Sequence, residues 1–273
     1  MKVSGQWLER AETQKVCSAL RDAGWQALPV GGCVRNALLG VPVADVDIAT
    51  DARPETVSDL AKKAGFKVVP TGIEHGTVTV IAGGVPYEIT TFRRDVETDG
   101  RRAVVAFSDR LEDDAARRDF TMNALYALPD GTVIDPLGGI ADLKARRVRF
   151  VGDAGTRIRE DYLRILRFFR FHAWYGDSGA GLDADGLAAC AELSAGIETL
   201  SSERLGAEMR KLLAAADPAP AVAAMAQAGV LRQVLPGADH RALAPLVHLE
   251  EGASPRWLRR LVVLGAEDAA GRL

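Results

Sequence analysis

The chain has 273 residues, of which 48% are hydrophobic and 26% are charged, and its formal net charge is −3. This composition is typical of a globular protein with one large or two ordinary domains. It excludes a membrane-spanning protein, because no apolar run approaches the roughly 18 to 20 residues that cross a bilayer. The three scattered cysteines have neither a metal-binding spacing nor the even number of a disulfide framework, and the N-terminus has no apolar signal-peptide core. We therefore expect a cytoplasmic protein that makes no contact with a membrane.

Strand and helix patterns alternate from the N-terminus to about residue 152. Apolar spacing, with glycine and proline at the boundaries, predicts these elements. In chain order they are a strand at 27–30, a turn at 31–32, a helix at 33–40, a strand at 45–50, a helix from 51 to 65, strands at 66–69, 77–82 and 85–92, a helix from 111 to 128, and strands at 132–135 and 147–152. The dense alternating charge of residues 95–107, around Gly100, is typical of a flexible loop.

After Gly152 the pattern becomes helical. We expect a long helix at 153–176, a second at 201–216 and a third from Pro218 or Pro220 to Gly229. No strand pattern follows residue 152. The predicted fold class is therefore α+β, with a mixed sheet first and an all-α part second.

Two aspartates stand one residue apart in the predicted strand 45–50. Asp45 and Asp47 are at positions i and i+2, so both carboxylates project from one face of the strand. Two like charges this close repel each other, and burial strengthens the repulsion. A divalent cation would relieve it, and carboxylate oxygens suit Mg²⁺. The pair predicts a magnesium site.

A phosphate-binding pattern lies just upstream of these aspartates. Gly31 and Gly32 leave bare backbone directly before a helix N-terminus, where amide groups and the helix dipole favour an anion. Arg35, one turn into that helix, can reach the same anion. Together with the aspartates, the pattern indicates a nucleoside triphosphate bound with its metal.

A third carboxylate is expected, because two-metal nucleotidyl transfer commonly uses three. Glu88 is the candidate, in the predicted strand 85–92 and on the face opposite to Tyr87 and Ile89. The alternative is that Glu88 is a solvent-facing glutamate without a catalytic role.

Several blocks of the chain resemble, in order, the class II tRNA nucleotidyltransferases, which are the CCA-adding enzymes. The resemblance covers about residues 28 to 215. Its blocks are GGCVRNALLG, DVDIAT, PTGIEHGTVTV, YEITTFRRD, RRDFTMNALY, DPLGGIADLKARRVRFVG and REDYLRILRFFRF. The family shares a polymerase-β-like head domain with bacterial poly(A) polymerases.

The resemblance implies a nucleotidyltransferase that adds C and A to the 3′ end of tRNA from CTP and ATP, with Mg²⁺ as cofactor. It implies a polymerase-β-like head at 1–152 with a mainly antiparallel sheet, a helical neck that reads the base at 153–215, and the start of a helical body at 216–273. Family members are usually longer, so we expect either a truncated body or a reduced grip on tRNA. Asn36 stands where the family often has aspartate.

Further site residues follow from the resemblance alone. RRDFTMNAL is similar to the family's ribose- and triphosphate-contacting helix, in which Arg118, Asp119 and Asn123 would be the polar contacts. Arg117 is expected to be a simple surface charge. EDYLR is similar to the motif in which an aspartate and an arginine, here Asp161 and Arg164, read the incoming base.

Glu160 is expected to orient Arg164 rather than to touch the base. An ordinary intrahelical ion pair is the alternative for the base-reading residues.

Rival functions remain open from the sequence. A poly(A) polymerase shares the head domain, and an enzyme with only CC- or A-adding activity has the same motifs. A small-molecule nucleotidyltransferase should lack the EDxxR motif, and an inactive RNA-binding module should have lost a carboxylate in DVD; the chain has both motifs intact.

Overall fold

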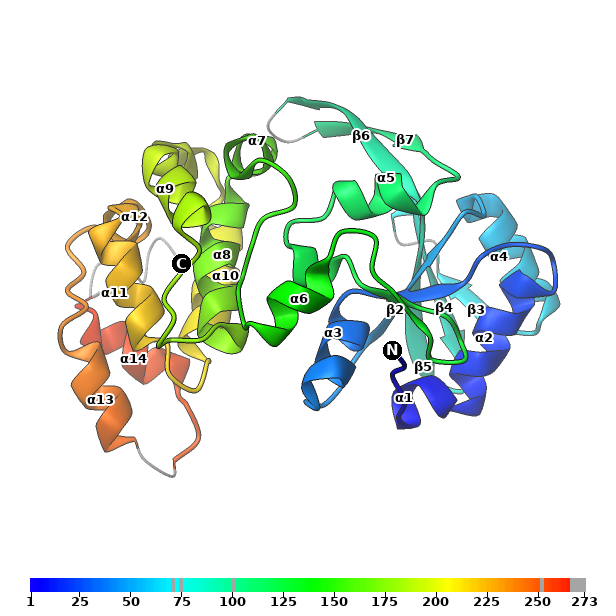
Figure 1. Ribbon diagram of the computed structural model, residues 1–273, viewed down its shortest axis with the longest axis horizontal. Helices are drawn as coiled ribbons and strands as arrows, with labels where there is room; N and C mark the ends of the chain where they lie inside the picture. The colour runs from blue at the N-terminus through cyan, green and yellow to red at the C-terminus, as the bar shows by residue number, and fades with distance from the viewer. Residues whose placement is uncertain (70–71, 74–75, 100–101, 251–252, 266–273) are drawn as a thin grey trace. The chain divides into compact units, whose positions relative to one another are not determined.

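A computed structural model of the chain describes residues 1–69, 72–73, 76–99, 102–250 and 253–265, without the side chains of 95–99 and 102–105. The chain divides into two compact units, Met1–Leu143 and Lys144–Leu273, here called the N-terminal and the C-terminal unit (Figure 1). Among the described residues, no helix is long and apolar enough to cross a membrane.

A seven-stranded sheet forms the centre of the N-terminal unit, with the strand order β3-β4-β5-β2-β1-β8-β9. The strands are β1 (Leu28–Val30), β2 (Val46–Thr50), β3 (Lys67–Val69), β4 (Thr77–Ala82), β5 (Val85–Thr91), β8 (Tyr126–Ala127) and β9 (Val133–Ile134). Strands β2 and β5 run parallel, and the other pairings within this sheet are antiparallel. The prediction of a mixed, mainly antiparallel sheet is confirmed.

Helices cover the sheet of the N-terminal unit. They are α1 (Gln6–Glu9), α2 (Ala11–Arg21), α3 (Gly32–Leu39), α4 (Pro54–Lys63), α5 (Leu111–Ala116) and α6 (Gly139–Lys144). Helices α2 and α4 pack on β4 (Figure 1). Leu20, Val57 and Val80 line the same small cavity among these elements. Helix α3 ends at Gly40, whose φ of 68° is the left-handed conformation that favours glycine at this position.

The prediction of a single helix at 111–128 is wrong. The structure has α5, then a 3₁₀ turn, η2 (Thr121–Asn123), and then strand β8. Asp119 Oδ1 accepts the main-chain N–H of Phe120 at 2.8 Å, a local bond that competes with helix formation. Tyr126 then pairs with Val30 of β1, so sheet formation decides the conformation of a segment that is buried on all sides.

Two further expectations for the N-terminal half of the chain are corrected. Residues 95–107 lie mostly in a two-stranded antiparallel hairpin of β6 (Arg93–Asp99) and β7 (Arg102–Phe107) rather than in a loop, and Gly100 lies outside the described residues. Residues 147–152 form no strand. The predicted hairpin of β4 and β5 is present, since Ala82 pairs with Val85 across the two intervening glycines.

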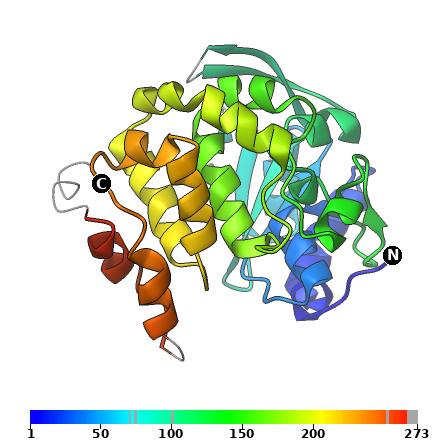
Figure 2. The same ribbon diagram turned by 60° about the vertical axis from the view of Figure 1, so that its left-hand side comes forward.

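The C-terminal unit is helical throughout its described residues. Its helices are α7 (Ala154–Glu160), α8 (Leu163–Tyr175), α9 (Ala184–Glu192), η3 (Ser194–Thr199), α10 (Ser202–Leu213), α11 (Ala219–Gln227), α12 (Val230–Val234), α13 (Leu243–Leu249) and α14 (Trp257–Val263). Helices α8, α10 and α11 pack side by side, as both views show (Figures 1 and 2). Buried Glu208 of α10 accepts from Arg170 Nε of α8 at 2.6 Å, which joins these two helices by a charged hydrogen bond.

The long helix expected at 153–176 is divided into α7 and α8. The break is at Asp161, whose φ of −157° and ψ of 105° are extended. The Asp161 side chain accepts the main-chain N–H of Leu163 at 3.1 Å, so it satisfies a donor at the start of α8. Asp161 therefore lies between two helices rather than within one.

Candidate functional site

The acidic residues of the N-terminal unit lie on neighbouring parallel strands. Asp47 of β2 is directly paired in register with Glu88 of β5. Their chain neighbours Val46 and Tyr87 are buried, whereas both acidic side chains are exposed. Asp45 precedes β2, which begins one residue later than expected. The alternation of side chains along a strand therefore puts Asp47 and Glu88 on one exposed face. The expected strand pair of Asp45 and Asp47 is not formed as such, because Asp45 lies outside the strand.

The electrostatics of Asp47 reflect this crowding. Its pKa is raised to about 6, first because the surrounding protein displaces water and second because Glu88 is negative. Asp45 adds to the rise, whereas the charge of Arg118 opposes it. Two neighbouring carboxylates therefore raise the pKa of Asp47, and an arginine partly offsets them.

These residues fit a divalent cation that a ligand would help to hold. Among the described residues, no three histidine, cysteine, aspartate or glutamate side chains are grouped to hold a metal ion by themselves. However, the like charges around Asp47 would be relieved by a cation, and Mg²⁺ is usually bound by one or two carboxylates together with phosphate oxygens. Asp45 and Asp47 are the two carboxylates here that could provide such a donor set.

The turn between β1 and α3 brings bare backbone beside an arginine. Gly31 has a φ of 69°, and its N–H donates to the main-chain oxygen of Leu125 at 2.9 Å. A Cβ at Gly31 would lie 3.4 Å from Arg118 Nη1 and 3.4 Å from the main-chain oxygen of Asn123. Helix α3 begins at the next residue, Gly32. The expected open backbone before a helix N-terminus is therefore present, and Arg118 lies against it.

We expected Arg35 to reach a bound anion directly, but in the structure its side chain contacts two asparagines of the protein. It is buried, and its Nη1 donates to Asn123 Oδ1. Its Nε and Nη2 donate to Asn36 Oδ1 at 3.2 and 3.0 Å, so the amide that replaces the family's aspartate still accepts from the arginine. Asn123 Nδ2 in turn donates to Asp119 Oδ1 at 2.9 Å. Asp119 and Asn123 are neighbours as predicted, but across a 3₁₀ turn rather than along an α-helix.

Arg118 is held by residues that were not predicted. Its Nη2 donates to Asp114 Oδ2 at 2.8 Å, and its guanidinium lies over the Tyr126 ring at 5.2 Å. Burial alone would raise the pKa of Asp114, but the charges of Arg118 and Arg117 hold it below its ordinary value. Arg117 Nη2 bonds to Asp114 Oδ1 at 2.6 Å, so the expectation of a simple surface charge is wrong. The spacing of Asp114 and Arg118, four residues apart, was the available signal for this pair.

In the C-terminal unit the two expected base-reading residues have separate partners. Arg164 Nη1 is paired with Glu160 and donates to the main-chain oxygen of Arg157 at 2.7 Å. Asp161 is paired with Arg204 Nη2 at 2.7 Å. Glu160 therefore contacts Arg164, which is the contact that an orienting role requires. The placement on a single helix face does not hold, because Asp161 lies at the break before α8.

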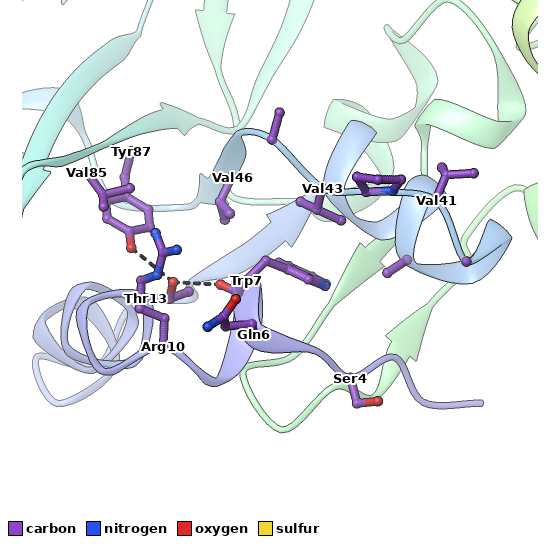
Figure 3. A pocket seen from close by; sticks show the side chains of 14 residues that line it. Ser4, Gln6, Trp7, Arg10, Thr13, Val41, Val43, Val46, Val85 and Tyr87 are labelled. Carbon is purple, nitrogen blue, oxygen red and sulfur yellow. Dashed lines mark hydrogen bonds between the residues drawn. The ribbon is translucent and has the colours of Figure 1, made fainter.

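A cavity of about 470 Å³ lies on the other face of the strands that carry the acidic residues. Val46 and Tyr87 line it, together with Trp7 and Arg10 from the N-terminal helices and Val43 from the segment before β2 (Figure 3). Because neighbouring residues of a strand point to opposite faces, this cavity is separate from the acidic site.

Comparison with known proteins identifies the family. Residues 27–149 match the family described as "Poly A polymerase head domain", and residues 181–241 match "Probable RNA and SrmB- binding site of polymerase A". The chain is 42% identical over 236 residues to the CCA-adding enzyme of Geobacillus thermodenitrificans, covering 86% of this chain and 55% of that protein. It is 44% identical over 184 residues to the mitochondrial CCA tRNA nucleotidyltransferase 1 of Homo sapiens, covering 67% of this chain and 42% of that protein.

A solved structure agrees with these relatives. The CCA-adding enzyme of Bacillus stearothermophilus, crystallised in complex with CTP, superposes with a TM-score of 0.73 at 35% identity, over 95% of this chain and 68% of that one. The chain spans about half the length of the curated relatives it matches. The motifs, the mixed sheet followed by helices, and these similarities lead to one conclusion: the chain belongs to the family of CCA-adding tRNA nucleotidyltransferases, which shares its head domain with the poly(A) polymerases.

Proposed function

We propose that this protein adds C and A residues to the 3′ end of tRNA, using CTP and ATP and releasing pyrophosphate. The observation that carries the proposal is the register of Asp47 opposite Glu88, in the same unit as the Gly31 turn and Arg118. The relatives named as CCA-adding enzymes support the choice of substrates.

The proposed reaction is an in-line displacement at phosphorus. The 3′-hydroxyl oxygen of the RNA forms a bond to the α-phosphorus of the nucleotide and releases its proton to water. The bond from the α-phosphorus to the bridging oxygen of the β-phosphate breaks, and pyrophosphate leaves with that electron pair. Main-chain N–H groups at the start of α3, beginning with that of Gly32, would hold phosphate oxygens. The N–H of Gly31 donates to Leu125, so Gly31 would contribute only the bare backbone beside the phosphates. Arg118, which lies against Gly31, would stabilise the charge that develops on the leaving group.

Mg²⁺ is the proposed metal, with Asp45 and Asp47 as its ligands and Glu88 as a further carboxylate of the site. When bound, the ion would lower the pKa of the 3′-hydroxyl and neutralise phosphate charge. Asp119 and Asn123, which are hydrogen-bonded to each other, would contact the ribose. Arg35 would act by holding Asn123 rather than by binding phosphate itself.

Base selection is proposed to depend on Asp161 and Arg164. A carboxylate accepts a hydrogen bond from an exocyclic amine, and a guanidinium donates to a ring nitrogen or carbonyl. Cytosine and adenine both carry an exocyclic amine beside an acceptor, so one pair of side chains can serve both bases and reject uracil and guanine. The pairing of Glu160 with Arg164 would keep the guanidinium in the required orientation.

We propose that residues 1–152 act as the catalytic head, 153–215 as the base-reading neck and 216–273 as the start of the body. The cytoplasm is the proposed compartment, and the three cysteines are buried free thiols, which is compatible with its reducing conditions.

The deciding experiment uses purified protein, Mg²⁺ and labelled CTP or ATP with three tRNA substrates. These end before the tail, after C, and after CC. We expect addition that stops once CCA is complete, read as product length on a gel. A protein that leaves all three tRNAs unchanged would refute the proposal.

A poly(A) polymerase is the second candidate, because the matching head domain is described by that name. It predicts long tails made from ATP alone, whereas a CC-adding or A-adding enzyme extends only some of the three substrates. The same gel distinguishes all of these outcomes.

A further inference from the structure

We infer that Asp114 and Tyr126 are positioning residues that aim one edge of Arg118 at the bound nucleotide's phosphates. The inference rests on the proposed function, because it assigns a task to residues around that site. It concerns two side chains that contact Arg118 and to which the sequence motifs assign no role.

The first step is the way in which Asp114 holds the arginine. Asp114 is 1% exposed, so its charge is shielded from water and strongly felt by its partners. Its Oδ2 accepts from Arg118 Nη2 at 2.8 Å and from the Tyr126 hydroxyl at 2.7 Å. Arg118 Nε also donates to the Tyr126 hydroxyl at 3.1 Å. The Nε–Nη2 edge of Arg118 is therefore fixed by a buried carboxylate and a buried phenol.

The second step is the opposite edge of the same guanidinium. Arg118 Nη1 lies 3.4 Å from the main-chain oxygen of Asn123 and 3.4 Å from where a Cβ of Gly31 would be. Because a guanidinium is planar and rigid, fixing one edge determines the direction of the other. Nη1 therefore points at the turn that is proposed to hold the phosphates.

The third step concerns the charge of the cluster. Arg117 Nε and Nη2 occupy the other oxygen of Asp114 at 2.8 and 2.6 Å. Two guanidinium groups and one carboxylate leave one positive charge, and Arg118 exerts its charge on Asp47. Asp114 thus holds Arg118 in place through one oxygen, while Arg117 binds the other oxygen of the same carboxylate. A preorganised positive group of this kind is what a departing pyrophosphate requires.

The test compares steady-state kinetics and nucleotide affinity in four proteins: wild type, Asp114→Asn, Arg118→Ala and the double variant. CTP with Mg²⁺ and a tRNA ending before the tail are the substrates. We expect Asp114→Asn to raise the KM and the Kd for CTP by about 10-fold, the factor for one charged hydrogen bond, with tRNA affinity unchanged. In the Arg118→Ala background the same substitution should change the KM less than about twofold, because it acts through Arg118.

Asp113→Asn is the matched control. Asp113 is the preceding acidic residue of α5, but it accepts from the Ser108 hydroxyl at 2.6 Å and not from Arg118. The Asp113→Asn protein should have the same KM and Kd for CTP as the wild type. If Asp114→Asn fails to fold, Tyr126→Phe replaces it, because it removes only the hydroxyl and keeps the ring beneath Arg118; it should raise the KM for CTP a few-fold.

Three outcomes overturn the inference. The first is a folded Asp114→Asn or Tyr126→Phe protein with the KM and Kd of wild type. The second is a double variant whose increase in the KM for CTP equals the product of the increases caused by Asp114→Asn and by Arg118→Ala. The third is a wild type that neither extends tRNA nor binds CTP, which overturns the proposed function as well, whereas the first two leave that function intact.

Discussion

Asp47 lies directly opposite Glu88 on two parallel strands, and the charge of Glu88 contributes to a pKa of about 6 at Asp47. These two residues should contribute unequally to the rate of nucleotidyl transfer. Asp47→Asn is expected to lower turnover at least about 100-fold, because it removes a proposed metal ligand. Glu88→Gln should have a smaller effect if Glu88 acts mainly through its charge. Turnover in an Mg²⁺-dependent tRNA extension assay measures both, with circular dichroism as the control for folding.

Full turnover by Asp47→Asn would remove Asp47 from the mechanism. Unchanged turnover by Glu88→Gln would leave Glu88 as a solvent-facing strand residue, which is the alternative that the sequence left open.

The same carboxylate should lower stability at neutral pH when no metal is present. Asp47 keeps its proton up to about pH 6 in the folded chain, whereas an unfolded aspartate loses it near its ordinary pKa of about 3.9. Between these values the unfolded state binds fewer protons, so this group's contribution to stability falls as the pH rises. In EDTA at pH 7.5, Asp47→Asn should therefore melt about 1–3 °C above wild type. The side chain is exposed, so the gain is small.

The difference should disappear near pH 4, where Asp47 is protonated in the wild type. Adding Mg²⁺ at pH 7.5 should raise the melting temperature of the wild type more than that of the variant. Equal melting curves of both proteins at every pH would show that the charges around Asp47 do not repel as described.

Gly31 should be intolerant of a side chain for a local reason. Its φ is 69°, and a Cβ there would meet Arg118 Nη1 and the Asn123 carbonyl, both at 3.4 Å. Gly31→Ala is expected to raise the Kd for CTP at least about 10-fold, because a φ of 69° with a ψ of −115° suits glycine alone and an alanine would change the turn on which Arg118 lies.

Gly40→Ala is the comparison: its φ of 68° is similar, its ψ of 22° is ordinary left-handed backbone, and no atom lies within 4 Å of the added Cβ. It should cost about 1 kcal/mol of unfolding free energy from backbone strain alone and leave CTP binding unchanged. Equal effects of both variants on CTP binding, measured by calorimetry, would contradict a specific role for Gly31.

Arg164 should determine base selectivity more than overall stability. Arg164→Ala is expected to reduce the preference for CTP over UTP by about 10- to 100-fold, the range for a lost hydrogen bond from a charged donor. Arg159→Ala, an exposed arginine of α7, serves as the control and should keep the preference. Kinetics with all four nucleoside triphosphates provide the measurement. An unchanged preference in Arg164→Ala would mean that Arg164 does not read the base.

Much of the acidic and glycine-rich part of the site could be inferred from local rules. The alternation of strand residues places Asp47 and Glu88 on an exposed face, and glycine at the start of a helix predicts open backbone. The charged contacts around them could not be inferred in the same way. Arg35 was expected at the phosphates, but in the structure it donates to Asn123, which is 88 residues away in the chain.

The sequence by itself determined most strands and helices up to residue 92, the outward-facing positions of Asp47 and Glu88 on their strands, and the family. These depend on short spacings that any chain with the same residues would show. Only the tertiary structure decided that residues 111–128 divide into α5, a 3₁₀ turn and β8, because pairing with β1 outweighs helix propensity. It likewise decided that Asp114 holds Arg118 beside Gly31, because that contact requires β1 and β8 to be paired first.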